Sequence, residues 1–439
     1  MSDSMQFNRR DTLALVLSGF VAAALGGKAL AQDAKALSFW AVHTGTPELA
    51  AAMQTIIDQF EKEKAGTNVK FESVNGALVY PKFLTAVQGQ SMPDVADGYS
   101  YHPLQFAALD QMLPLDDLIG EWKENGLLDQ VVNEYAYKKF LWNGHYWAVP
   151  WNLDIRAIYY RKDLLEKAGV KPPTNWDEFQ AAAIKLNDPA NGTFGFVFPA
   201  GNFHIAQHFY MMFMLQAGGS ILDKDGNLVF GTTSKDANVQ ALTYLTDFAL
   251  KHKVTPEGIA SYNTDEPHTL FIQGRAAFAT GTGGLISRLL KEAPDMVPNV
   301  GVLEVLQGPK AKLAAGFYNP LFVWKYSPNV DLAKEFVSWL VQPGRLQPLY
   351  TAYPGNCWPI LKSEFNSEVF KKTPLLADVI EKVIPYTTDF AYPGTGIPQM
   401  GAIDGEKMFA APVNEVIAGT KTPEQAVLDA HANMAKLFT

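Results

Sequence analysis

A strand, a helix and a second strand follow one another where the body of the chain begins, and this order constrains the fold more than any other feature. Residues 36–42 form a mostly apolar run that is typical of a buried strand, and Thr46 and Pro47 have the pattern of a helix N-cap followed by proline. Apolar side chains then recur at helical spacing, at Leu49, Met53, Ile56, Ile57 and Phe60. Residues 69–73 return to a period of two. Such a unit normally forms a right-handed crossover between parallel strands, with ligand loops at the carboxyl ends of those strands.

The same order recurs further along the chain. Residues 147–160 have the pattern of a strand, Thr174 is expected to cap a helix, and the apolar stripe of that helix consists of Trp176, Phe179, Ala183 and Leu186. Another helical stripe lies within residues 330–340, and residues 422–425 (TPEQ) have capping-box spacing. We find no internal repeat and no low-complexity linker. We therefore predict an α/β fold of two lobes, each a mainly parallel sheet flanked by helices.

The first 31 residues differ from the rest and have the pattern of a secretory signal. Arg9 and Arg10 precede an apolar stretch over residues 13–27, and residues 29–31 (ALA) match an A-x-A cleavage site. The stretch is short for a membrane anchor and rich in glycine and alanine. The arginine pair resembles a twin-arginine export signal, although the flanking residues depart from the usual pattern. We exclude residues 1–31 from the fold.

Composition excludes several other classes of protein. With 48% hydrophobic and 18% charged residues, the chain resembles neither a disordered protein nor a coiled coil. No apolar run beyond the signal approaches the ~20 residues of a membrane-spanning helix. The formal charge is −9 without a basic block, which argues against nucleic acid or acidic lipid as a partner. The single cysteine, Cys357, allows no internal disulfide and no N-terminal lipid, so we expect a free periplasmic protein.

Short motifs are spread over almost the whole mature chain. The most specific are residues 143–150 (NGHYWAVP), 158–169 (IYYRKDLLEKAG) and 172–178 (PPTNWDE). Weaker ones are residues 93–95 (PDV), 271–278 (FIQGRAAF), 333–336 (AKEF), 397–400 (IPQM) and 422–426 (TPEQA). In this order they resemble the extracellular solute-binding proteins of ABC importers, specifically the maltose-binding-protein-like group that handles sugars. Arg161 stands where asparagine is usual and Asn175 separates Thr174 from Trp176, and neither change touches the expected pocket.

The resemblance implies an architecture and a function. The protein would capture a mono- or oligosaccharide in a cleft between two lobes, close about a hinge, and deliver the ligand to a permease in the membrane. It would act as a monomer, without a cofactor or a metal, and it would not be an enzyme. The chain would cross between the lobes near residue 150, residues 300–304 and residues 341–344. The lobes would comprise residues 32–150 with 305–342, and residues 151–304 with 343–439.

Sugar binding needs flat aromatic faces and polar side chains that satisfy hydroxyls. Period-two alternation puts Asn152, Asp154 and Arg156 on one face of a strand, and Asp154 matches a ligand-contacting acidic position of the family. Tyr101 and His102 match family positions that face the ligand. The full set of expected ligand-binding residues is Trp40, His43, Thr46, Tyr99, Tyr101, His102, Trp151, Asn152, Asp154, Arg156, Asn202, Phe203, His204, Gly281, Thr282, Gly283, Tyr318, Asn319, Tyr353, Asn356, Trp358 and Tyr392.

Two features of the family are missing. Residues 201–204 (GNFH) correspond to a loop that carries an acidic contact, but they include no carboxylate. Residues 281–284 (GTGG) replace the usual Gly-Pro-Trp, so a stacking tryptophan is lost and backbone would approach the ligand. We expect Trp358 to be the main stacking platform, together with Tyr99 or Tyr101.

Other interpretations of these residues remain open. The aromatic candidates, Trp40 and Trp151 among them, could be packing residues, and Asp154 with Arg156 could be a structural pair. Arginine and histidine side chains also suit an anionic ligand, such as a phosphorylated or sulfonated polyol or a uronate. A secreted glycosidase would need two carboxylates ~5–9.5 Å apart, and Asp154 with Asp97 or Asp404 is a nominal pair without a sequence signal. The eight histidines show no convincing metal-ligand spacing. A neutral sugar ranks first.

Overall fold

The computed structural model describes residues 35–438, so the expected signal peptide lies outside the described residues. Strand β1 (Lys35–Ala41) lies between β2 (Thr67–Ser73) and β3 (Val95–Asp97) and is parallel to both. Helix α1 (Pro47–Glu63) connects β1 to β2, and the Thr46 hydroxyl accepts a hydrogen bond from the Leu49 amide at 3.3 Å. The predicted strand–helix–strand unit and its cap are confirmed.

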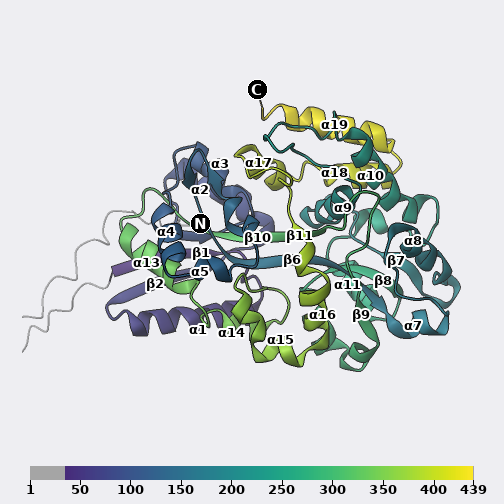
Figure 1. The fold of residues 1–439 in the computed structure, drawn as a ribbon, viewed down its shortest axis with the longest axis horizontal. Coiled ribbons are helices and arrows are strands. Elements are labelled where there is room, and N and C mark those ends of the chain that lie inside the picture. Colours follow the sequence, from purple (N-terminus) through teal and green to yellow (C-terminus); the bar gives the residue numbers. More distant parts are fainter. Residues whose placement is uncertain (1–34, 439) are drawn as a thin grey trace, which may run out of the picture. The chain divides into compact units, whose positions relative to one another are not determined.

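Two long strands join the two halves of the sheet (Figure 1). Strand β6 (Val149–Arg161) pairs over residues 149–155 with β10 (Ala314–Val323), and over residues 156–161 with β8 (Ala276–Thr282) and β9 (Val300–Val302). These pairings, and that of β10 with β3, are antiparallel. The sheet order is β2-β1-β3-β10-β6-β8-β7, with β7 (Phe194–Val197) parallel to β8. The α/β class is confirmed.

The first half of the sheet, here called the first strand group, comprises β2, β1, β3 and the part of β10 that pairs with β3. Phe39 of β1 packs edge-on against Phe336, which also meets Phe60 of α1 edge-on, so helices and strands share one core. The other elements from this part of the sequence, with two later helices, are α2 (Val79–Gly89), α3 (His102–Ala108), α4 (Asp116–Glu124), α5 (Leu127–Gln130), α6 (Tyr135–Lys138), β4 (Leu141–Trp142), β5 (His145–Tyr146), α13 (Val330–Leu340) and α14 (Gln347–Ala352).

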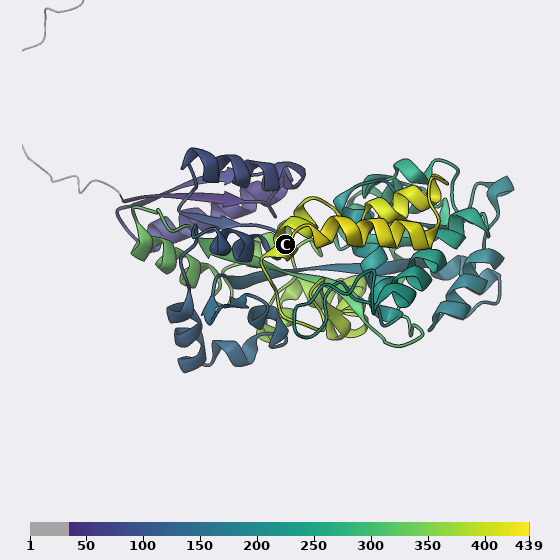
Figure 2. The ribbon, with the colours of Figure 1, turned by 90° about the horizontal axis from the view of Figure 1, so that it is seen from above.

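The second strand group comprises β8, β9, β7 and the second part of β6. Helix α9 (His204–Gln216) is buried on all sides from Ile205 to Gln216. The C-terminal helices α18 (Ala411–Ile417) and α19 (Pro423–Ala435) lie over α10 (Lys235–Leu250), as the view from above shows (Figure 2). The helices that complete this region are α7 (Lys162–Lys167), α8 (Trp176–Lys185), α10 (Lys235–Leu250), α11 (Asp265–Ile272), α12 (Gly284–Glu292), α18 (Ala411–Ile417) and α19 (Pro423–Ala435).

The start of α8 corrects one prediction. Asn175, not Thr174, is the N-cap, because the Asn175 side chain accepts a hydrogen bond from the Glu178 amide at 3.0 Å. Thr174 instead donates its amide and hydroxyl to the Glu178 carboxylate, at 2.9 and 2.8 Å. The inserted asparagine has taken over the capping position, since its side chain reaches the same donor. The other predicted cap, Thr422 on α19, accepts from the Gln425 amide at 3.2 Å as expected.

Residues 343–366 contact several elements from the first half of the chain. Helix α14 packs on α1, Arg345 forms a two-point ion pair with Glu63 at 2.7 and 3.0 Å, and Leu361 bridges to Val131. The chain then continues through α15 (Glu368–Lys372), α16 (Pro374–Lys382), β11 (Thr387–Thr388) and α17 (Gln399–Gly405). Short 3-10 helices cover Gly76–Leu78, Pro189–Asn191, Ile259–Ser261, Pro294–Asn299, Lys362–Asn366 and Ile384–Tyr386. Between residues 35 and 438, no helix has both the length and the apolar character needed to cross a membrane.

Candidate functional site

A cavity of about 520 Å³ lies where the ends of β1 and β3 face β6, β10, α9 and the end of α17. Both strand groups contribute to its walls. The predicted ligand residues that line it are His43, Tyr99, Asp154, Arg156, Phe203, His204, Thr282 and Asn319. Lining residues that were not among the predicted ligand residues are Gly76, Val79, Tyr80, Pro81, Ser100, Ile205, His208, Asn263, Thr264, Phe317, Asp404, Gly405 and Lys407.

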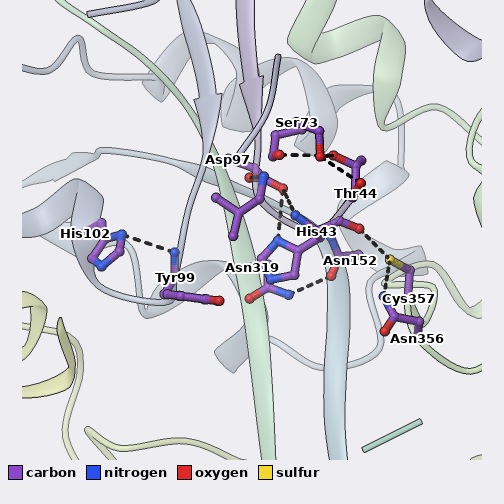
Figure 3. Close-up of polar contacts among 12 residues, drawn as sticks. His43, Thr44, Ser73, Asp97, Tyr99, His102, Asn152, Asn319, Asn356 and Cys357 are labelled. Atoms are coloured by element: carbon purple, nitrogen blue, oxygen red, sulfur yellow. Dashed lines mark hydrogen bonds and ion pairs between the residues drawn. The ribbon is translucent and has the colours of Figure 1, made fainter. Parts of the chain in front are cut away.

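His43 follows β1 and is oriented by a buried carboxylate (Figure 3). Its Nδ1 lies 2.9 Å from Oδ2 of Asp97. The Asp97 carboxylate also accepts hydrogen bonds from two backbone amides, that of Val42 on Oδ1 and that of His43 on Oδ2. The imidazole ring meets Tyr99 and Trp151 edge-on, with centroids 5.7 and 6.3 Å away. The ring therefore has a fixed position on the wall of the cavity.

Tyr99 connects the two sides of the cavity. Its ring stacks on that of His204, the first residue of α9, at a centroid distance of 4.8 Å and an interplanar angle of 25°. The tyrosine fits because residue 76 is glycine, since a Cβ there would lie 2.1 Å from the Tyr99 hydroxyl. Burial, together with the carboxylates of Asp154 and Asp404, raises the pKa of Tyr99, so its hydroxyl stays neutral.

Asp154 and Arg156 form an ion pair on β6 at 2.7 Å, as the structural interpretation of these residues anticipated. The Asp154 side chain is 22% exposed, whereas that of Arg156 is 4% exposed and lies 4.8 Å above the Phe317 ring. Arg156 also donates from Nη1 to the Ile155 carbonyl, and from Nε and Nη2 to Nδ1 of His208, at 2.9, 3.1 and 2.7 Å. Its guanidinium is almost fully engaged within the protein.

His204, His208 and Asp404 bring three groups of metal-ligating type within 4.8 Å of one another. His204 Nε2 lies 2.7 Å from Asp404 Oδ1, which also accepts from Gln207 Nε2 at 2.7 Å. Nδ1 of His208, however, accepts hydrogen bonds from the Arg156 guanidinium, whose positive charge opposes a cation nearby. Burial and that charge lower the pKa of His208 and keep the ring neutral. The cluster has the donor pattern of a hydrogen-bonded network. The four-residue spacing of His204 and His208 is the sequence feature that could have pointed to His208, which was not among the expected ligand residues.

Two of the three expected stacking platforms, Trp358 and Tyr101, lie in the protein core. Trp358 is buried and stacks on Phe370, with centroids 5.6 Å apart. Tyr101 is also buried, and its hydroxyl donates to the buried carboxylate of Asp389. Neither residue lines the cavity. Tyr99 is the named alternative that does line it.

Several other predicted ligand residues have packing or capping roles. His102 is buried behind Tyr99, whose amide donates to its Nδ1 at 3.3 Å, and burial lowers its pKa to about 4. Asn152 and Asn319 bond to each other at 2.7 Å, and only Asn319 reaches the cavity. Gly283 is required by packing, since a Cβ there would lie 1.5 Å from the Gly355 carbonyl oxygen. The remaining predicted residues outside the lining are Trp40, Thr46, Trp151, Asn202, Gly281, Tyr318, Tyr353, Asn356 and Tyr392.

Comparison with known proteins places the chain in a family. Residues 44–345 match the model of the bacterial extracellular solute-binding proteins, and the chain belongs to that family. It is 25% identical, over 92% of its length and 94% of the relative's, to YcjN of Escherichia coli (strain K12), which carries the name of an ABC transporter periplasmic-binding protein. It is 24% identical to the arabinooligosaccharide-binding protein of Bacillus subtilis (strain 168), covering 74% of this chain and 73% of the relative.

Among solved structures, a sugar transporter from Arthrobacter chlorophenolicus A6 with bound laminaribiose is 27% identical. Its TM-score is 0.80, and the alignment covers 91% of this chain and 99% of that chain. The family resemblance and the two-lobed α/β fold that it implies are thereby confirmed.

Proposed function

We propose that this protein is the periplasmic receptor of an ABC importer and that it captures a neutral mono- or oligosaccharide. The observation that carries the proposal is the cavity between the strand groups, which combines aromatic rings with oriented hydrogen-bonding groups. The rings of Tyr99 and Phe203 line the cavity, and so do Asp154 and Thr282, whose side chains carry oxygens. This is the mixture that sugar binding requires. The laminaribiose bound to the Arthrobacter relative supports the same class of ligand.

Apart from Lys407, the charged side chains that line the cavity are paired within the protein, and this pairing favours a neutral ligand over an anionic one. Asp97 is hydrogen bonded to His43, Asp404 to His204, and Asp154 is paired with Arg156. The arginine therefore does not present a free fork to a carboxylate or a phosphate. These hydrogen bonds also argue against a glycosidase, because two of the nominal catalytic carboxylates, Asp97 and Asp404, already accept hydrogen bonds from protein groups. No bond is made or broken in the proposed function.

The two lobes in this proposal correspond to the two strand groups. Crossings near residue 150 and residues 300–304 agree with the pairing of β6 and β9, whereas the contacts of α14 with α1 favour a third crossing after residue 366. The signal over residues 1–31 would export the protein, which would act as a monomer and pass its ligand to a membrane permease. Binding would bias the hinge toward the closed form, since only that form contacts the ligand with both lobes.

A thermal-shift screen of the purified mature protein against neutral sugars, beginning with laminaribiose and arabino-oligosaccharides, tests the proposal. A ligand at 100 times its Kd adds about 2.7 kcal/mol to the unfolding free energy. Small-angle scattering with the stabilising sugar should show a smaller radius of gyration. If no neutral saccharide stabilises the protein, or if saturation leaves the radius of gyration unchanged, the proposed function is wrong.

A further inference from the structure

The guanidinium of Arg156 has an unusual partner for an arginine on the wall of a ligand cavity. Nε and Nη2 of an arginine form the fork that grips the two oxygens of a carboxylate or phosphate. In this protein both nitrogens point at one lone pair, that of His208 Nδ1, at 3.1 and 2.7 Å. Histidine here occupies the place that an anion would take.

The surroundings hold this arrangement in place. Both side chains are buried, and the imidazole of His208 and the guanidinium of Arg156 lie against the same Phe317 ring, at 4.0 and 4.8 Å. His208 also meets the ring of His204 edge-on, with the ring centroids 4.3 Å apart. Because Nδ1 accepts from arginine, a neutral His208 must carry its proton on Nε2. Three aromatic rings surround the His208 imidazole: those of His204 on α9, Phe317 on β10 and Phe390. They leave the imidazole little room to rotate away from Arg156.

The remaining donors of Arg156 are directed elsewhere. Nη1 already serves the Ile155 carbonyl and Asp154, so the histidine occupies the Nε–Nη2 edge, which is the remaining edge of the guanidinium that suits an anion. The structure assigns to His208 the role of a specificity-determining residue: by occupying the fork of Arg156, it makes the cavity select neutral saccharides over acidic ones. Specificity often depends on such a device against the wrong ligand, as well as on contacts to the right one. This inference rests on the proposed sugar site.

The test replaces the acceptor and measures binding of an acidic sugar. In His208→Leu the fork loses its partner, and calorimetry should show D-glucuronate binding at least tenfold more tightly than to the wild type. His208→Gln keeps an acceptor oxygen and should remain close to the wild type. His268→Leu removes a buried histidine that does not line the cavity, and it serves as the control for loss of a buried imidazole. Adding Arg156→Lys to His208→Leu should abolish the gain, because lysine has no fork.

Two results would overturn the inference. One is an unchanged affinity for D-glucuronate in His208→Leu, and the other is tight glucuronate binding by the wild type that Arg156→Lys removes. If the leucine variant does not fold, ¹⁵N NMR of the wild-type histidines decides the question. His208 should show the tautomer with its proton on Nε2 and stay neutral between pH 5 and 8, and a proton on Nδ1 would contradict the assignment. If neutral sugars do not bind the wild type, the proposed function is wrong. The affinities of the wild type and His208→Leu for D-glucuronate can still be compared in that case.

Discussion

At the residue scale, Asp154 is the carboxylate whose environment leaves an oxygen for a ligand. Its Oδ1 pairs with Arg156, and the side chain keeps part of its surface in the cavity. Asp97 differs, because it is fully buried and accepts from two backbone amides and an imidazole. We therefore expect Asp97 to hold the wall and Asp154 to contact the sugar.

Replacing Asp154 by asparagine should weaken binding of the stabilising sugar by about 10- to 100-fold. A hydrogen bond to a charged acceptor is worth about 1.5–3 kcal/mol, and the amide keeps the shape of the side chain while losing the charge. Isothermal titration calorimetry measures the effect. Asp163→Asn is the matched control, since Asp163 forms the same kind of pair with Arg161 at the far end of β6, outside the cavity. Equal affinities in the Asp154 variant and the wild type would remove Asp154 from the site.

At the scale of elements, the helix ends show how small changes in sequence move a structural role. Asn175 accepts from the Glu178 amide, and Glu178 accepts in turn from the amide and hydroxyl of Thr174. The hydrogen bonds from Thr174 lower the pKa of the Glu178 carboxyl. The cap at the start of α8 is thus displaced by one residue from the cap at Thr174 that the sequence pattern predicted.

Asn175→Ala should lower the free energy of unfolding by about 1 kcal/mol, because the Glu178 amide loses its acceptor at the start of the helix. Urea denaturation monitored by circular dichroism provides the measurement. Thr174→Ala removes an exposed hydroxyl but leaves the cap, so its cost should be smaller. If Thr174→Ala lowers the free energy of unfolding more than Asn175→Ala does, Thr174 rather than Asn175 is the main capping residue.

At the scale of the whole molecule, buried neutral histidines make stability depend on pH. Burial lowers the pKa of His102 to about 4 and that of His268 to about 3, and it also lowers the pKa of His208. In the unfolded chain these groups recover an ordinary pKa of about 6.5. Below that pH the unfolded chain binds protons that the folded protein does not, so acidification favours unfolding.

The free energy of unfolding should therefore fall between pH 7 and pH 5. Each such histidine contributes up to about 1.4 kcal/mol per pH unit once the pH is below 6.5, and almost nothing above pH 7.5. Urea denaturation at pH 7.5, 6 and 5 measures the slope. His268→Leu should make it shallower, since one of these groups is gone. A slope that is identical in the variant and the wild type would show that His268 titrates normally in the folded protein.

The α/β class, the first strand–helix–strand unit, the caps at Thr46 and Thr422 and the family itself followed from the sequence, because periodicity, capping and ordered motifs are local properties. Strand alternation likewise placed Asp154 and Arg156 close enough to pair. Tertiary structure alone decided which polar and aromatic side chains line the cavity. Trp358 and Tyr101 have the same residue types as a stacking platform, yet they pack into the core, whereas His208 and Asp404, far apart in sequence, meet because α9 and α17 converge there. Burial and hydrogen-bond partners depend on contacts between distant segments, and a pattern within one segment carries no record of them.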